Sequence, residues 1–234
     1  VIVCPDASLR ILVDIGVKPH LITSLERVLL LVKLVEGFTA EEVKDVFYAA
    51  CPVVFNEAYQ AYPGPRIIVY RNFDHFKWLK VDRGILDIKQ SSGNMAFKIL
   101  EALGCDPIIL VGQDCAFKSA EKTHADDAPS VTNLNLKEKD LIKVKGNYEE
   151  FVYTNQIYDL FRRGFVTDLA HYRGTCVNAT EGGAFIEGTT LMTLREAIDK
   201  YCAKPVATLE LFQKHLHYPT ENEIRREWRN FRKI

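Results

Sequence analysis

The chain has 234 residues, of which 47% are hydrophobic and 26% charged, and its formal net charge is −1. A charge so close to zero gives no field that would attract nucleic acid, and no apolar run approaches the ~20 residues that span a bilayer. The six cysteines show neither CxxC nor metal-finger spacing and no secretory signal pattern opens the chain, so we expect reduced, buried thiols in a cytoplasmic protein.

Short apolar runs alternate with helical patterns along the first ninety residues. The chain opens directly in such a run without a methionine, which suggests a piece of a longer protein. Gly16 is a good residue to end a helix, and Pro19 prevents its continuation. The segment 26–36 is apolar on every side, so we expect it to be buried or to contact a partner. The pattern predicts strands at 1–4, 21–24, 52–55 and 67–70, helices at 7–15, 26–36 and 72–80, and a strand or loop at 84–88.

The same alternation continues through the second half. Met95, Ile99 and Leu103 repeat every four residues, which predicts a helix over 95–103, and Gly104 separates it from a buried strand that ends near residue 111. Weak periodicity over 115–136 indicates a long loop. The pattern further predicts a helix at 148–165, a strand at 175–177, a helix at 194–201 and one or two helices within 206–234.

Strands that alternate with helices are typical of α/β proteins with a largely parallel sheet. We therefore predict a Rossmann-like, mostly parallel sheet with helices on both faces over residues 1–203, and a C-terminal helical extension over 204–234. The end of this extension, 225–233, is basic with interleaved aromatic residues. A solvated helix face with Trp228 and Phe231 packed is a better interpretation of that pattern than a nucleic-acid contact.

A polar turn precedes the helix predicted at 95–103. Backbone N–H groups point outward at a helix start, and such a start binds phosphate well. A capping serine in an ordinary turn is the competing interpretation, and the turn alone does not separate the two. The residues of this turn are Ser91, Ser92, Gly93 and Asn94.

A second polar group, Gly112, Gln113 and Asp114, follows the strand after that helix. Open α/β sheets bind ligands at the carboxyl ends of their strands. Gln113 and Asp114 can hydrogen-bond a ribose or a base there. Two polar groups that flank one helix–strand unit favour a nucleotide or phosphorylated ligand.

The long loop carries a third candidate, His124, with Asp126 and Asp127 close behind. The ordinary pKa of histidine, ~6.5, suits a general base. Together with Asp114, the two aspartates can hold a divalent cation. For the aspartates a solvated loop is the better interpretation, and for His124 both interpretations stay open.

Three more positions lie where strands are expected to end. Glu181, followed by Gly182 and Gly183, comes after a predicted strand, and paired glycines allow close approach of a ligand. A glycine turn with Glu181 at a helix start is the plainer alternative. Asp6 and Ser24 follow the first two strands, so we expect these polar residues to surround one crevice.

Several of these segments together resemble a bacterial and archaeal family. It comprises the motility accessory factors, among them flagellin glycosyltransferases, and the hydroxymethylpterin pyrophosphokinase-like proteins. The resemblance extends over residues 1 to about 200. The segments that carry it are 92–94, 103–114, 123–125 and 180–184.

The central domain of that family also resembles bacterial sialyltransferases that use a cytidine-monophosphate sugar. The resemblance implies that Ser91, Ser92 and Gly93 help to hold the nucleotide and that Asp114 is the acid at the strand end. Two features differ. A glycine-rich G-x-G-P-S-L loop, which the family has ahead of this region, is absent, and the tyrosines that assist the leaving phosphate are replaced in the segment 115–117 by Cys, Ala and Phe.

The resemblance implies a glycosyltransferase that moves a nonulosonic, sialic-acid-like sugar from its CMP donor to a protein hydroxyl such as a flagellin Ser or Thr. His124 would be the base, Glu181 would orient sugar or acceptor, and no resident metal is expected. One alternative is a hydroxymethylpterin pyrophosphokinase that uses ATP and Mg²⁺, with Asp114, Asp126 and Asp127 as metal ligands. Another is a non-catalytic binding module on the same fold.

Overall fold

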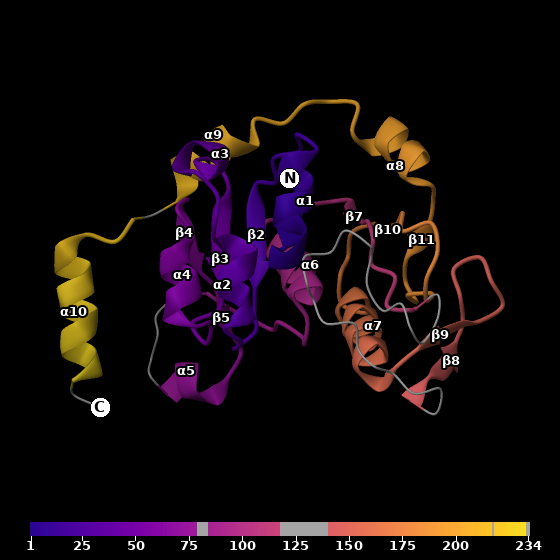
Figure 1. Cartoon of the computed structure of the whole chain (residues 1–234), viewed down its shortest axis with the longest axis horizontal. Coiled ribbons are helices and arrows are strands. Elements are labelled where there is room, and N and C mark those ends of the chain that lie inside the picture. The colour runs from indigo at the N-terminus through magenta and orange to yellow at the C-terminus, as the bar shows by residue number, and fades with distance from the viewer. Residues whose placement is uncertain (79–83, 118–139, 217, 233–234) are drawn as a thin grey trace.

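The computed structural model describes residues 1–78, 84–117, 140–216 and 218–232 (Figure 1). The expected α/β class is confirmed, because parallel strands flanked by helices form most of the fold. The parallel strands are divided between two larger sheets that lie side by side, with one helix, α6 (Ser92–Ala102), between them (Figure 1). The predictions for His124, Asp126 and Asp127 lie outside the described residues.

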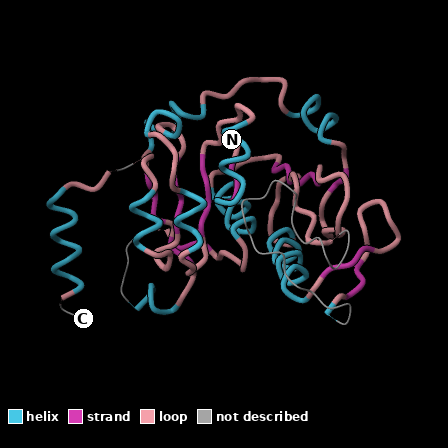
Figure 2. The backbone as a smooth tube through the Cα atoms, viewed as in Figure 1, coloured by secondary structure: helices cyan, strands magenta, loops and turns pink. Residues whose placement is uncertain are grey.

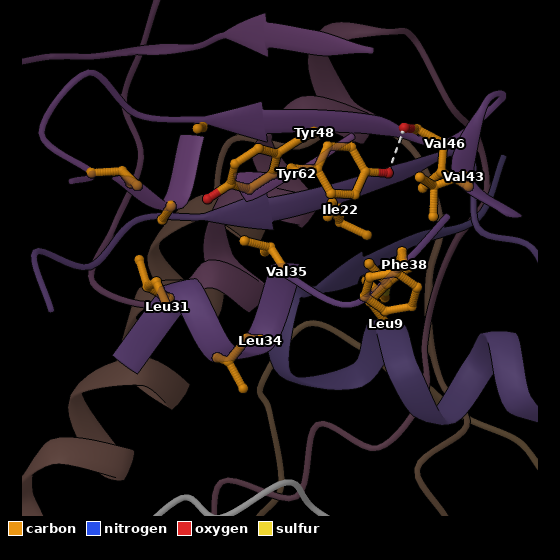
Figure 3. Packing of buried hydrophobic residues seen from close by; sticks show 14 residues of the cluster. Leu9, Ile22, Leu31, Leu34, Val35, Phe38, Val43, Val46, Tyr48 and Tyr62 are labelled. Atoms are coloured by element: carbon orange, nitrogen blue, oxygen red, sulfur yellow. Dashed lines mark hydrogen bonds between the residues drawn. The ribbon is translucent and has the colours of Figure 1, made fainter. Parts of the chain in front are cut away.

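The first sheet has four parallel strands in the order β1-β2-β3-β4. Every residue of its two central strands is buried, which places this sheet in the core on both faces. Figure 3 shows the cluster on one face, where Ile22, Val35 and Tyr48 pack closely and the Tyr62 hydroxyl donates to the Val46 carbonyl at 2.8 Å. The strands are Val3–Pro5, Leu21–Ser24, Phe47–Ala50 and Arg66–Ile68, and the helices are η1 (Asp6–Ser8), α1 (Leu9–Asp14), α2 (Leu30–Val35), α3 (Ala40–Val43) and α4 (Asn56–Ala61).

The strand predicted at 52–55 is wrong. The pairing strand is β3 at Phe47–Ala50, and the chain turns directly after it, where the Val54 N–H donates to the Cys51 carbonyl at 3.0 Å. Pro52 cannot donate to a ladder, which explains why this apolar run does not pair. The helix predicted at 26–36 is shorter, and it buries Leu31, Leu34 and Val35 inside the chain.

The second sheet has three parallel strands in the order β11-β10-β7. β7 (Ile108–Leu110) follows α6, and α7 (Gln156–Leu169) precedes β10 (Cys176–Asn178). Figure 2 shows these strands apart from those of the first sheet. β11 (Thr190–Leu191) completes the second sheet. Between β4 and α6, on the side of the first sheet, lie β5 (Tyr70–Arg71), α5 (Asp74–Trp78) and β6 (Ile85–Leu86) (Figure 1).

The predicted helix at 148–165 is wrong over its first eight residues. An antiparallel hairpin of β8 (Ile142–Val144) and β9 (Val152–Thr154) occupies this region, and α7 begins only after it. The Asn155 side chain accepts from the Tyr158 N–H at 2.8 Å and thus caps α7. The helix therefore begins at this cap, although the apolar periodicity of the sequence starts earlier, at residue 148.

The C-terminal segment runs back across the molecule after α8 (Leu194–Tyr201) (Figure 1). α9 (Thr208–His215) packs on the first sheet, where the Phe212 ring meets the Phe47 ring edge-on at 5.7 Å. α10 (Glu221–Phe231) lies at the end of the molecule beyond α4 (Figure 1). None of the helices in the described ranges is long and apolar enough to cross a membrane.

Candidate functional site

The N-terminus of α6 is built by a reciprocal cap. The Ser91 hydroxyl accepts from the Asn94 N–H at 3.0 Å, and Asn94 Oδ1 accepts from the Ser91 N–H at 3.2 Å. The Asn94 Nδ2 group donates to the Phe161 carbonyl of α7 at 3.2 Å. Asn94 is wholly buried, so its side chain holds α6 against α7, and the Ser92 and Gly93 positions are left at the open end of the helix.

The carboxyl edge of the first sheet reaches this helix start. The Thr23 hydroxyl at the end of β2 donates to the Ser92 carbonyl at 2.9 Å. Neighbouring Ser24 donates to Asp6, whose other oxygen accepts from the Ala7 N–H at 2.8 Å. Asp6 and Ser24 therefore lie in contact, and these two buried side chains satisfy each other inside the fold.

Burial shapes the proton affinities at this edge. Removal from water raises the pKa of Asp6 to about 6, although the Ser24 hydroxyl and the Ala7 N–H favour its charged form. Burial also raises the pKa of Tyr48 to about 12, and the charge of Asp6 raises it further. The Tyr48 hydroxyl points toward the carboxyl ends of the strands (Figure 3) and has no hydrogen-bond partner within the described part of the chain. This edge thus holds one unsatisfied buried donor.

The carboxyl edge of the second sheet reaches the same helix start from the other side. After β7 the chain turns at Gly112, whose φ is +65°, and the Gln113 N–H donates to the Thr180 hydroxyl at 3.1 Å. A Cβ atom at Gly93 would lie 2.6 Å from Gln113 Oε1, so the Gln113 amide lies directly over the first turn of α6. We call the group Thr23, Ser92, Gly93 and Gln113 the edge site.

The remaining predicted residues of the second sheet contact one another and α8. Gly183 lets the backbone pass Asp114 closely, because a Cβ there would lie 2.5 Å from the Asp114 carbonyl. The Ala184 N–H donates to that carbonyl at 2.8 Å. Glu181 Oε1 accepts from the Leu194 N–H at 2.8 Å at the start of α8, and Gly182 has open space around its Cβ position. Close packing of the Gly183 loop therefore orders the segment that carries Asp114.

Two residues that the sequence analysis did not select lie close to this region. Tyr158, in the first turn of α7, packs edge-on against Phe117 at 4.8 Å. Burial raises the pKa of Tyr158, and the neighbouring Cys115 and Glu26 raise it further, so its hydroxyl is a proton donor at neutral pH. No local motif marks either residue, because Phe117 bonds to Tyr153 of β9 and α7 carries Tyr158 to this region by packing against α6.

A cavity of about 470 Å³ lies at the opposite edge of the second sheet. Its lining includes Asp106 before β7, Gly174 before β10, and His171 at the end of α7. None of the predicted site residues lines it. We place the candidate site at the carboxyl edges instead, because the polar residues and the start of α6 lie there. In the ranges that the structure describes, no three His, Cys, Asp or Glu side chains are grouped as metal ligands.

Parallel strands joined by helices, with a helix N-terminus between their carboxyl edges, define a Rossmann-like α/β fold. The chain belongs to the MptE-like family, described as 6-hydroxymethylpterin diphosphokinase MptE-like, whose model matches residues 1–120. This confirms the family expected from the sequence.

A solved structure of MAf glycosyltransferase from Magnetospirillum magneticum AMB-1 has a similar fold, with a TM-score of 0.63 and 15% sequence identity. The similarity covers 100% of this chain and 33% of that one, so the chain spans about a third of its structural neighbour. A search of curated proteins found no match.

Proposed function

We propose that the chain is a glycosyltransferase domain that moves a nonulosonic sugar from a CMP donor to a protein hydroxyl, such as a Ser or Thr of flagellin. The observation that carries the proposal is the edge site, where both sheets meet the open start of α6. The fold shared with a structure named as a glycosyltransferase supports the same reaction class.

In this reaction the start of α6 would receive the donor phosphate through its outward N–H groups and the Ser92 hydroxyl. Ser92 is half-buried, and its hydroxyl has no hydrogen-bond partner among the described residues. The Gln113 amide would bind the nucleotide, and the Tyr158 hydroxyl would donate to the leaving phosphate. His124 as base and Glu181 as the residue that orients the sugar or acceptor remain proposals from the sequence.

Calorimetric titration with CMP tests the site. Ser92→Ala removes a hydroxyl that bonds to no described residue, so we expect CMP affinity to fall about tenfold with little change in stability. A lost hydrogen bond to a charged group costs ~1.5 kcal/mol. Ser91→Ala is the matched control. It removes the cap, so we expect a loss of about 1 kcal/mol in stability and a smaller change in affinity. Absence of heat with any cytidine nucleotide would exclude the proposal.

The family description favours one second candidate, a 6-hydroxymethylpterin diphosphokinase that uses ATP and Mg²⁺. Asp114 with Asp126 and Asp127 would then hold the metal. Consumption of ATP that requires both Mg²⁺ and a hydroxymethylpterin, with no release of CMP from a CMP sugar, would select this activity. If neither reaction occurs and Asp114→Ala leaves the cellular function intact, the domain is a binding module.

A further inference from the structure

One buried carboxylate of α7 contacts both α6 and the segment that leads into it. Asp168, in the last turn of α7, is only 3% exposed. Its Oδ1 atom lies 3.9 Å from Lys89 Nζ and 3.7 Å from Lys98 Nζ. Burial raises the pKa of Asp168, and the charges of Lys98 and Lys89 oppose this by favouring the carboxylate. A buried carboxylate without a cation is strongly unfavourable, so the two lysines are held beside it.

The two lysines are closely matched except in their place along the chain. Lys89 Nζ also lies 2.5 Å from Asp87 of its own segment, and Lys98 Nζ lies 2.5 Å from Glu101 of α6. Among the ion pairs of the described residues, those to Asp168 alone join these lysines to α7. Lys89 lies two residues before the N-cap of α6, whereas Lys98 lies in the middle of that helix. The first pair therefore bears on the helix start and the second on the helix body.

The backbone next to Lys89 is held from the side of the first sheet as well. The Ile88 carbonyl accepts from Arg71 Nε of β5 at 2.8 Å. The Ile88 side chain is buried in the cluster that contains Met95 of α6. The approach to the edge site is thus fixed on one side by Arg71 and on the other by Asp168.

α7 also passes the start of α6 at very short range. A Cβ atom at Gly164 would lie 3.0 Å from Asn94 Oδ1 and 3.1 Å from Lys89 Cβ, which is tighter than ordinary van der Waals contact. Asn94 Nδ2 donates to the Phe161 carbonyl of α7 at 3.2 Å. The same helix carries Tyr158 in its first turn. The contacts of α7 therefore set the position of the helix start relative to Tyr158.

We infer that Asp168 is a positioning residue of the edge site, which through Lys89 holds the open start of α6 where it would meet the donor phosphate. The inference rests on the proposed function. The Asp168 carboxylate is buried against α6, so it acts on the ligand only through the backbone that Lys89 holds. Without this ion pair the N–H groups at the helix start would occupy a wider range of positions, and a misplaced group binds its ligand less well.

The test is calorimetric titration of the full natural protein with CMP. Asp168→Asn keeps the size of the side chain and removes its charge, so we expect the Kd for CMP to rise about 3- to 10-fold. Electrostatics alone would change the Kd in the opposite direction, because loss of a negative charge favours the binding of an anion. Lys89→Met should raise the Kd by a similar factor, and Lys89→Arg, which can keep the ion pair, should restore it. Lys98→Met is the matched control and should leave the Kd within about twofold.

Amide hydrogen exchange without ligand reports on the helix start directly. The Ser91 and Asn94 N–H groups donate within the cap at 3.2 and 3.0 Å. Their exchange should accelerate about tenfold in Asp168→Asn and in Lys89→Met, and it should not change in Lys98→Met.

The outcomes separate this inference from the proposed function. An unchanged or tighter CMP affinity of Asp168→Asn, or an equal loss in Lys98→Met and Lys89→Met, would overturn the inference and leave the proposed function intact. If Asp168→Asn does not fold, Lys89→Met and Lys89→Arg decide in the same way. If the wild-type protein does not bind CMP, the proposed function fails, and unchanged exchange of the Ser91 and Asn94 amides in Lys89→Met would overturn the positioning role too.

Discussion

The carboxyl edges of the two parallel sheets differ in what their polar residues contact. At the first edge, Ser24 and Asp6 bond to each other and Thr23 bonds to the backbone of α6, over strands that are buried throughout. At the second edge, Gln113 extends its amide over Gly93 while its own N–H is held by Thr180. The first edge therefore stabilises the fold around α6, and the second presents a positioned polar group at the open helix start.

The largest expected effect is on the core beneath the first edge. Ile22 is wholly buried between Cys4 and Tyr48, so Ile22→Ala should lower the free energy of unfolding by about 2–5 kcal/mol. Ile109 is the middle residue of β7, an edge strand of the second sheet, and is only partly buried, so Ile109→Ala should cost about half as much. Urea unfolding of both variants, with the exposed Ile15→Ala as control, measures the difference. Equal losses of unfolding free energy in the two variants would contradict the view that the first sheet is more deeply packed than the second.

The second prediction concerns the pH dependence of the first edge. Burial raises the pKa of Asp6 to about 6 from the ordinary value of 3.8, so the folded protein binds this proton more tightly than the unfolded chain does. The stability contributed by protonated Asp6 is complete below pH ~3.8 and is lost as the pH rises through about 6. Relative to Asp6→Asn, the wild-type protein should therefore lose up to about 3 kcal/mol between pH 4 and pH 7.

Urea unfolding at four pH values between 4 and 7 checks this expectation. Asp14→Asn is the matched control, because Asp14 is exposed and pairs with Arg10 on the surface at 3.6 Å, so its curve should stay parallel to the wild type. A constant difference between wild type and Asp6→Asn over this range would show that the Asp6 carboxyl is not buried in solution.

The contrast between the edges also explains which features the sequence could predict. Local signals were sufficient where one segment decides the outcome: β2 and α8 have the predicted bounds, Gly16 adopts φ +81° as a helix end, and Ser91 caps α6. Local signals failed where strand pairing determines the structure. The third strand was predicted at 52–55 instead of 47–50, because no local feature shows that 47–50 pairs with a strand on each side.

The candidate site divides in the same way. The polar turn at 91–94 and the strand-end group at 112–114 follow local rules, and the contact of Gln113 with Gly93 brings them together. Thr23 and Tyr158 carry no motif, since their relevance comes from the packing of β2 and α7 around α6. The division of the strands between two sheets likewise depends on contacts far apart in the sequence.

Gly93→Ala should have the smallest effect on stability. It also distinguishes most clearly between the roles of the two sheet edges. The added Cβ would lie 2.6 Å from Gln113 Oε1, so the amide must move, and because it is the end of a flexible side chain this movement should cost less than about 1 kcal/mol. Alanine also has a better helix propensity than glycine, which offsets part of that cost.

The nucleotide contact should suffer more, with CMP affinity falling about 3- to 10-fold by titration. Gln113→Ala, which removes the same amide directly, should give a similar loss, and combining it with Gly93→Ala should add little, since both act through one group. Additive losses would instead mean that the Cβ atom blocks the helix start itself, and the two edges would then not differ in the way their contacts indicate.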